Sequence, residues 1–208
     1  MTVGMKQNKA KVIGLTGGIA TGKSTVSNIL KEKGFKIIDA DKIAREIVEV
    51  GSPAYKKILD YFGESILNND ETINRVYLGQ KIFNSQTLRA KVNDITHPYI
   101  IEKISKEIGL YSSEDIIFLD VPLLLETIDK FEAKGICIDK LWIVYCDEKT
   151  EIERLMIRNN LSYEEAVKRV SAQMSIEEKK ELADTIIDNT KDMETLIENI
   201  EKALKEIS

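Results

Sequence analysis

The sequence predicts an α/β fold of three layers, in which helices cover both faces of a parallel sheet. Two observations support this fold class: short apolar runs alternate with stretches of helical periodicity, and a glycine-rich turn follows the first run. The runs are apolar almost throughout, which is typical of parallel strands that are buried on both faces. The order of the strands in the sheet does not follow from these patterns.

Apolar runs predict the strands, and apolar residues at helical spacing predict the helices between and after them. The strands are expected at residues 11–15, 35–38, 115–120, 141–146 and 185–188. The helices are expected at residues 24–33, 43–50, 54–61, 75–83, 98–110, 149–159, 162–174 and 193–207. Gly34 is expected to end the first helix, and Pro98 can begin a helix because its missing N–H needs no partner in a first turn.

The chain is predicted to form a single domain over residues 1–208, with a core at residues 11–44, 111–148 and 183–208. The helical stretch at residues 45–110 is interpreted as an insertion into that core. The charged helix pair at residues 149–182 is interpreted as a second, smaller excursion.

Composition is that of an ordinary soluble protein, with 43% hydrophobic and 31% charged residues. The net charge of −5 argues against a protein that coats nucleic acid, and no apolar run approaches the roughly 20 residues of a membrane span. Residues 1–11 carry three lysines and no hydrophobic stretch, so they are predicted to be a loose leader and not a secretory signal. Cys137 and Cys146 are interpreted as free thiols, because they have no partners at a metal-type spacing. We expect a cytoplasmic protein without nucleic-acid or membrane partners, either a monomer or a weak homo-oligomer.

The strongest functional signal is the phosphate-binding pattern G-x-x-x-x-G-K-[ST], which residues 17–24 match. Its glycines let the backbone wrap around a phosphate, and the following helix directs its N-terminal dipole at the same group. Lys23 is expected to reach the β- and γ-phosphates, and the Ser24 hydroxyl to ligate Mg²⁺. A chance glycine turn is the alternative, but a strand precedes and a helix follows, as the motif requires. We therefore predict ATP binding by Gly17, Ala20, Thr21, Gly22, Lys23, Ser24 and Thr25.

Acidic residues follow two of the predicted strands. Asp120 ends the third strand, where a carboxylate would hold Mg²⁺ directly or through water, and helix capping is its alternative role. Asp39 and Asp41 follow the second strand, and ligands of parallel α/β sheets bind at the carboxyl ends of the strands. We assign the helix-capping role to Asp39. Asp41 is the predicted catalytic residue, which orients an acceptor hydroxyl and accepts its proton.

Basic residues between positions 151 and 173 indicate a lid over the nucleotide. A guanidinium that reaches the transferring phosphoryl group is worth roughly 10³–10⁵ in rate in P-loop enzymes. Most arginines on a charged helix are only solvated, but Arg158 lies at a break before two asparagines and is the best placed. The sequence has no Asn-Lys-x-Asp guanine motif, which disfavours a GTPase.

Further motifs extend along almost the whole chain. They are Gly14-Leu-Thr-Gly-Gly-Ile-Ala-Thr-Gly-Lys-Ser-Thr-Val26, Ile38-Asp-Ala-Asp41 with Ala44-Arg45, Thr96-His97-Pro98, Asp120-Val-Pro-Leu-Leu124 with Glu126, Arg158-Asn-Asn-Leu161 through Gln173, and Ala183-Asp-Thr-Ile-Ile-Asp-Asn189. In order and spacing these segments resemble the dephospho-CoA kinase family. Asn74 stands where that family favours Asp, and Leu125 stands where an aromatic residue is common, so fine contacts to the acceptor are less secure than the activity.

The resemblance implies a P-loop NTPase fold and phosphorylation of the 3'-hydroxyl of dephospho-CoA by ATP with Mg²⁺, the last step of coenzyme A synthesis. It implies that residues 45–110 bind the acceptor, that residues 149–182 form the lid with Arg158, and that Asp41 is the catalytic acid-base. The residues expected at the acceptor are Asp39, Asp41, Arg45, Arg75, His97, Pro98, Leu123 and Glu126. His97 and Pro98 are equally explained as a helix start.

Two other functions compete with this one. The first is a P-loop kinase for a different alcohol, such as a nucleoside or shikimate. The second is a nucleotide-dependent regulatory module, which leaves the paired aspartates and the lid arginines unexplained.

Overall fold

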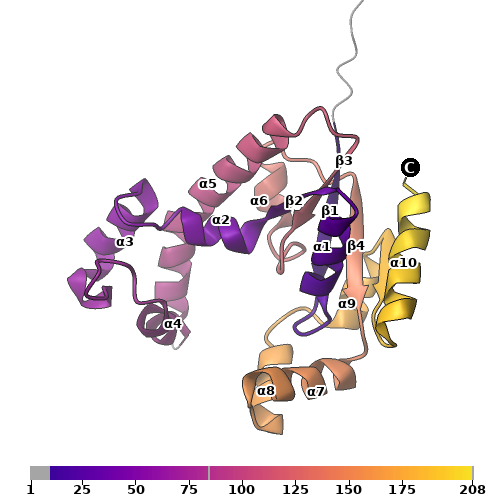
Figure 1. Ribbon diagram of the computed structural model, residues 1–208. Coiled ribbons are helices and arrows are strands. Elements are labelled where there is room, and N and C mark those ends of the chain that lie inside the picture. The colour runs from indigo at the N-terminus through magenta and orange to yellow at the C-terminus, as the bar shows by residue number, and fades with distance from the viewer. Residues whose placement is uncertain (1–9, 84, 208) are drawn as a thin grey trace, which may run out of the picture. The chain divides into compact units, whose positions relative to one another are not determined.

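The computed structural model describes residues 10–83 and 85–207 (Figure 1). Residues 1–9, most of the expected leader, lie outside the described residues. The chain divides into two compact units. The sheet unit comprises the residues up to Ile38 and those from Leu110 onward, and the helical unit comprises Asp39–Gly109.

The sheet has five strands in the order β2-β3-β1-β4-β5. They are β1 (Lys11–Gly17), β2 (Lys36–Asp39), β3 (Ile116–Asp120), β4 (Lys140–Tyr145) and β5 (Thr185–Asp188). β1 pairs in parallel with β3 and β4, which sets Leu15 opposite both Asp120 and Trp142, and β4 pairs in parallel with β5. The predicted α/β class with a parallel sheet is confirmed, and every predicted strand is present within two residues of its expected bounds.

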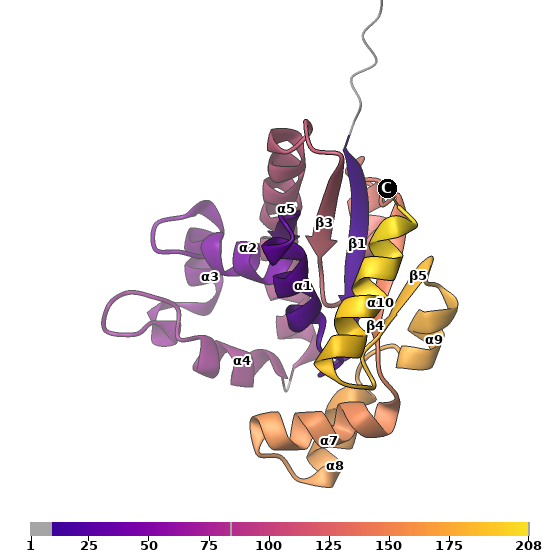
Figure 2. The same ribbon diagram turned by 45° about the vertical axis from the view of Figure 1, so that its right-hand side comes forward.

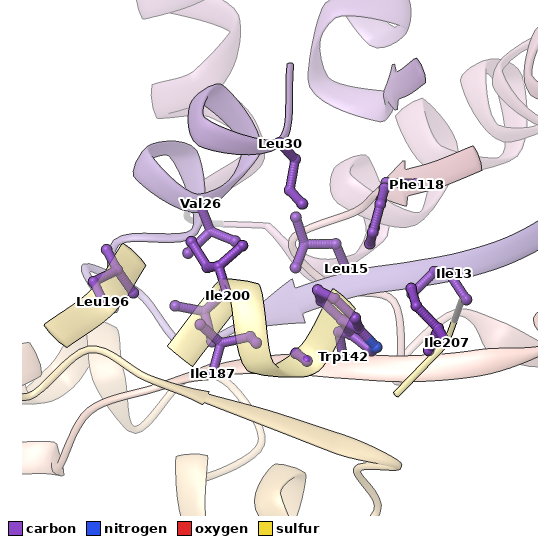
Figure 3. Packing of buried hydrophobic residues seen from close by; sticks show 12 residues of the cluster. Ile13, Leu15, Val26, Leu30, Phe118, Trp142, Ile187, Leu196, Ile200 and Ile207 are labelled. Atoms are coloured by element: carbon purple, nitrogen blue, oxygen red, sulfur yellow. The ribbon is translucent and has the colours of Figure 1, made fainter. Parts of the chain in front are cut away.

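One face of the sheet is covered by α1 (Lys23–Glu32) and α10 (Met193–Lys205), which Figure 2 shows in front of the strands. Apolar residues four apart on each helix point toward the strands: Val26 and Leu30 on α1, and Leu196 and Ile200 on α10 (Figure 3). They pack with Trp142 of β4 in one buried cluster. Burying an aliphatic side chain of this size stabilises the fold by about 1.5–3 kcal/mol, so this layer holds the phosphate-binding turn on a rigid base.

The opposite face of β4 is covered by α9 (Ile176–Glu181). Side chains alternate along a strand, so Tyr145 points away from the face on which Trp142 lies. The Tyr145 hydroxyl donates to Glu177 of α9 at 2.7 Å, and Lys180 lies 4.4 Å from the centre of the Tyr145 ring. Helices therefore lie on both faces, which confirms the three-layer arrangement.

The remaining helices of the sheet unit are α6 (Ile128–Glu132), α7 (Glu148–Asn159) and α8 (Tyr163–Val170). α7 and α8 pack through Leu155 and Ala166, both fully buried. The helix expected at residues 162–174 ends at Val170, and α6 and α9 were not predicted, because helices this short show little periodicity. The capping box of Ser175 and Glu178 is the local signal that marks the start of α9.

The helical unit contains α2 (Ala40–Glu46), α3 (Pro53–Phe62), the short 3₁₀ helix η1 (Glu64–Ile66), α4 (Arg75–Phe83) and α5 (Gln86–Leu110). Its own core includes Tyr55, Ile58, Leu78 and Ile95. α5 has 25 residues but mixes polar and apolar ones. Among the described residues, no helix is long and apolar enough to cross a membrane.

The prediction that His97 and Pro98 begin a helix is wrong, because Pro98 lies inside α5. A proline there lacks the N–H that would bond to the carbonyl four residues earlier. The helix continues because it is held on both sides of the proline by packing, with Ile95 before it and Ile101 and Ile104 after it all buried. The local proline signal was therefore overridden by tertiary contacts.

Candidate active site

The turn between β1 and α1 forms a closed loop. Ala20 and Gly22 have positive φ angles of 64° and 92°, which curl the backbone. The N–H and the hydroxyl of Thr21 both donate to the Gly18 carbonyl, at 3.4 and 3.0 Å. Gly22 is also the N-cap of α1. Its carbonyl accepts from the Thr25 N–H at 2.9 Å, but it has no side chain, so the first N–H groups of the helix have no side-chain cap. Uncapped N–H groups at the start of a helix, next to a curled backbone, are the arrangement that binds phosphate.

Asn189, directly after β5, supports the loop from outside. Its side-chain N–H donates to the Thr21 carbonyl at 2.7 Å, and its backbone N–H donates to the Tyr145 carbonyl at 2.8 Å. Arg154 of α7 donates to the Asn189 carbonyl at 2.9 Å. A Cβ atom at Gly22 would overlap the Asn189 side-chain amide. The shape of the loop thus depends on contacts with β5 and α7.

Gly22→Ala is expected to weaken ATP binding at least about tenfold, because the methyl group displaces Asn189 and releases the Thr21 carbonyl. Alanine at a positive φ also costs about 1–2 kcal/mol of folding free energy. Gly34→Ala is the matched control: φ at Gly34 is 94°, and no described atom lies within 4 Å of the added Cβ. Calorimetric titration with ATP and urea denaturation measure the two effects. Equal losses of ATP affinity in both variants would contradict the role given to Asn189.

Lys23 and Asp120 face each other at the carboxyl end of the sheet. The two carboxylate oxygens of Asp120 accept from the Lys23 ammonium and from the Ser27 hydroxyl. The side chains of Lys23 and Asp120 are 17% and 7% exposed, so this ion pair is largely withdrawn from water. The loop therefore carries a positive charge beside its N–H groups, balanced in this structure by a carboxylate.

Ser24 and Asp120 fit a Mg²⁺ ion that is held mainly by phosphate and water. Ser24 is exposed at the start of α1, one residue from the lysine that pairs with Asp120. Among the described residues, no group of three or more His, Cys, Asp or Glu side chains could hold a metal ion. Mg²⁺ commonly binds through only one or two protein oxygens together with substrate phosphates and water, so a hydroxyl and a carboxylate suffice.

A second cluster of charges lies behind the loop. Lys179 of α9 is fully buried, and its ammonium lies 3.1 Å from a carboxylate oxygen of Glu126 and donates to the Gly17 carbonyl at 3.4 Å. Glu151 of α7 is 2% exposed, and its Oε1 has no hydrogen-bond partner among the described residues. Burial raises the pKa of Glu151 to about 7; Lys179 opposes this shift, and nearby acids on α7 and α9 add to it.

The raised pKa of Glu151 predicts that its contribution to stability falls as pH increases. Between about pH 4.5 and 7 the folded state holds a proton on Glu151 that the unfolded state has lost, so folding becomes less favourable as pH rises through this window and levels off above it. Glu151→Gln removes this dependence. From pH 5 to pH 8, the free energy of unfolding of the unsubstituted protein should therefore fall by about 2–3 kcal/mol relative to that of the variant. Urea denaturation measures this difference. A constant difference at the two pH values would show that Glu151 titrates normally.

The other predicted residues of the sheet unit lie at its surface. Arg158 is exposed near the end of α7, and its Nε donates to the side chain of Asn159 at 2.9 Å. Leu123 is 41% exposed in the segment after β3. Glu126, from the same segment, is the partner of Lys179. The lid role of Arg158 and the acceptor roles of Leu123 and Glu126 stay predictions.

In the helical unit, Asp39 caps α2, and its carboxylate accepts from the Lys42 N–H at 2.9 Å. The capping role predicted for Asp39 is therefore confirmed. Asp41 lies exposed in the first turn of α2. Arg45 and Arg75 come together, because the Arg75 guanidinium donates to the Arg45 carbonyl at 3.1 Å.

Arg75 also borders two pockets of the helical unit. One, of about 230 Å³, is lined mostly by apolar side chains of α2, α3, α4 and α5, with Arg75 and Thr96 as polar members. The other, of about 650 Å³, runs from Val48 to the segment before α4. His97 is half-buried on α5, next to Thr96, and Pro98 is exposed. The contacts of Arg45, Arg75, His97 and Pro98 with an acceptor stay predictions.

Sequence reasoning missed the residues that support the site from behind: Ser27, Glu151, Lys179 and Asn189. For Asn189 a signal existed, since it directly follows the last strand at the edge where ligands bind. For Lys179 the signal was weaker: it lies three residues after Ile176, on the apolar side of a charged helix.

Comparison with known proteins gives the chain a family. A family model described as dephospho-CoA kinase matches residues 11–195. A dephospho-CoA kinase of Carboxydothermus hydrogenoformans is 48% identical over 192 residues, which cover 91% of this chain and 90% of the relative. The solved structure of a dephospho-CoA kinase from Campylobacter jejuni is 31% identical with a TM-score of 0.65, and the match covers 96% of this chain and 98% of that one. A solved structure from Thermus thermophilus is 26% identical with a TM-score of 0.80, covering 96% and 99% of the two chains. The chain therefore belongs to the dephospho-CoA kinase family.

Proposed function

We propose that this protein transfers the γ-phosphoryl group of ATP to the 3'-hydroxyl of dephospho-CoA, which yields coenzyme A and ADP. The observation that carries the proposal is the closed phosphate loop with Lys23 and Asp120, in a chain of the dephospho-CoA kinase family. Kinases for other alcohols share this loop, but they belong to other families. A regulatory module leaves the paired aspartates and the lid arginines unexplained, and it does not account for the family.

On this proposal the loop binds the phosphates of ATP through its N–H groups, and the Lys23 ammonium moves its charge from Asp120 to the β- and γ-phosphates. Ser24 and Asp120 hold Mg²⁺, which when bound neutralises charge on the phosphates. Arg158 serves as the lid arginine that stabilises the transferring phosphoryl group. Its side chain is exposed and donates to the adjacent Asn159, so it lies at the surface, from which it can turn toward the phosphates. Closure of a lid excludes water that would otherwise hydrolyse ATP.

We assign binding of dephospho-CoA to the helical unit. Its small pocket combines an apolar lining, which suits the pantetheine arm, with the Arg75 guanidinium, which suits a phosphate. Arg45 adds a second positive charge close by, since its carbonyl accepts from Arg75. An apolar pocket beside two arginines matches an acceptor that is long, partly apolar and phosphorylated.

Asp41 is the proposed acceptor of the 3'-hydroxyl proton. Asp39 is committed to capping α2, whereas the Asp41 carboxylate is exposed one residue into the same helix. In a loose transition state the carboxylate mainly orients the hydroxyl and takes its proton late, so one well-placed oxygen is sufficient. We further propose that the enzyme works in the cytoplasm, where ATP is supplied, as a monomer or a weak homo-oligomer.

The test is ADP release from purified protein with ATP, Mg²⁺ and dephospho-CoA, beside adenosine, pantothenate, shikimate and no-acceptor controls. Turnover with dephospho-CoA alone, and a product phosphorylated at the 3'-position, would support the proposal. Turnover on another alcohol would retain the kinase and reject the acceptor. ATP binding without turnover on any acceptor would favour a regulatory module.

A further inference from the structure

Lys179 is a fully buried lysine within the predicted lid, and no role was predicted for it. It lies on α9, far from the loop in sequence, yet its ammonium donates to the carbonyl of Gly17, the first residue of the phosphate-binding pattern. Burying an ammonium group is costly unless it is paired and hydrogen-bonded. Glu126 supplies the pairing charge at 3.1 Å, and Lys179 also attracts the carboxylate of Glu151 and so opposes the rise in its pKa.

The hydrogen bond from Lys179 to the Gly17 carbonyl orients a whole peptide group, and not only the carbonyl oxygen. A trans peptide is planar, and its C=O and N–H point in opposite directions. When the Gly17 carbonyl is held toward Lys179, the plane of the peptide that enters the loop is set, and the N–H of Gly18 points away from the ammonium. Lys179 thereby determines the direction in which the backbone leaves β1.

Glu151 limits the same peptide from another side. A Cβ atom on Gly18 would overlap the Glu151 carboxylate, so the loop backbone lies directly against this side chain. Glu151 and Gly18 also line a pocket of about 300 Å³ beside the loop. The entry of the loop is therefore held between charged groups of α7 and α9, both of which are helices of the proposed lid.

We propose that Lys179 is a positioning residue of the phosphate-binding loop, which holds the Gly17 carbonyl so that the loop keeps its ATP-binding shape, with Glu126 and Glu151 holding Lys179 in place. Lys179 does not touch the nucleotide; it acts through Gly17. The proposal rests on the use of ATP by this family and not on the identity of the acceptor.

The test compares Lys179→Met, the double variant Lys179→Met/Glu151→Gln, and Lys180→Met at pH 8, where Glu151 is mostly ionised. The double variant removes one positive and one negative charge and so restores the charge balance of the buried cluster. Lys180, the next residue on α9, pairs with Glu177 at the surface and serves as the matched control. Each variant is assayed for melting temperature, for the Kd of ATP by calorimetry without acceptor, and for the KM of dephospho-CoA.

A positioning role predicts that the double variant regains most of the melting temperature but binds ATP roughly tenfold or more weakly, as expected for loss of a charged hydrogen bond. The KM of dephospho-CoA should stay within about twofold in the double variant. In Lys180→Met, the Kd of ATP and the KM of dephospho-CoA should both stay within about twofold, and the melting temperature should stay close to that of the unsubstituted protein. If the double variant recovers ATP affinity together with its melting temperature, Lys179 only balances buried charge and the proposal is wrong. If Lys179→Met alone does not fold, the charge-balanced double variant decides. ATP affinity is read without acceptor, so a protein that proves inactive on dephospho-CoA still gives a result.

Discussion

Asp41→Asn is expected to lower kcat by roughly 10²–10⁴-fold while the Kd of ATP changes less than about twofold. The amide has the shape of the carboxylate but cannot take the proton of the acceptor hydroxyl. Because Asp41 is exposed in the first turn of α2, the substitution disturbs no core contact. It removes the favourable effect of an acidic group at a helix N-terminus, about 0.3–1 kcal/mol.

The measurement is steady-state turnover with dephospho-CoA, together with calorimetric titration of ATP. Asp60→Asn is the matched control, since Asp60 is an exposed acid on α3 of the same helical unit. The pH dependence adds a second readout: a residual rate that rises with hydroxide would indicate that solvent replaces the missing base. Near-normal kcat in Asp41→Asn would remove Asp41 from the mechanism and leave the acceptor proton to another group.

The parts of the site that sequence predicted correctly are those encoded locally. The loop at residues 17–24 is a short pattern between a strand and a helix. Its curl uses the backbone freedom of Gly22, although the second positive φ is at Ala20, which is not a glycine. The capping role of Asp39 was equally readable, because a cap depends on residues within one turn. Strand positions followed from apolar runs, since strands buried on both faces leave little room for polar residues.

The parts that sequence could not predict depend on contacts between distant residues. The segment Ile176–Glu181 contains adjacent lysines, and the spacing of Lys179 from Ile176 is only a weak local sign that Lys179 is buried while Lys180 pairs at the surface. That difference is set by Gly17 and Glu126, which lie far away in the chain. Pro98 gives the opposite case: a clear local signal for a helix start was overridden by the packing of α5.

Lys23→Met is expected to lower kcat/KM for ATP by roughly 10²–10³-fold, and most of the loss should appear in kcat. Methionine keeps the length and the apolar part of the side chain but removes the charge that the γ-phosphate needs as it leaves ADP. It also leaves the Asp120 carboxylate, 7% exposed, with the Ser27 hydroxyl but without its cation. Removing one partner of a buried ion pair costs about 3–5 kcal/mol, so lost stability must be separated from lost catalysis.

The double variant Lys23→Met/Asp120→Asn separates them, because it removes both charges of the pair. Its stability to urea should approach that of the unsubstituted protein, whereas its kcat/KM should stay at least as low as that of Lys23→Met. Lys33→Met controls for loss of a lysine near the same helix, since Lys33 pairs at 2.7 Å with the half-exposed Glu201 and surface pairs contribute about 0–1 kcal/mol. If the double variant recovers activity along with stability, Lys23 serves to neutralise Asp120 and the phosphates are bound by the loop backbone alone. If stability returns and activity does not, the loss of activity in Lys23→Met does not come from lost stability, and Lys23 and the proposed Mg²⁺ ligand Asp120 both belong to the catalytic machinery.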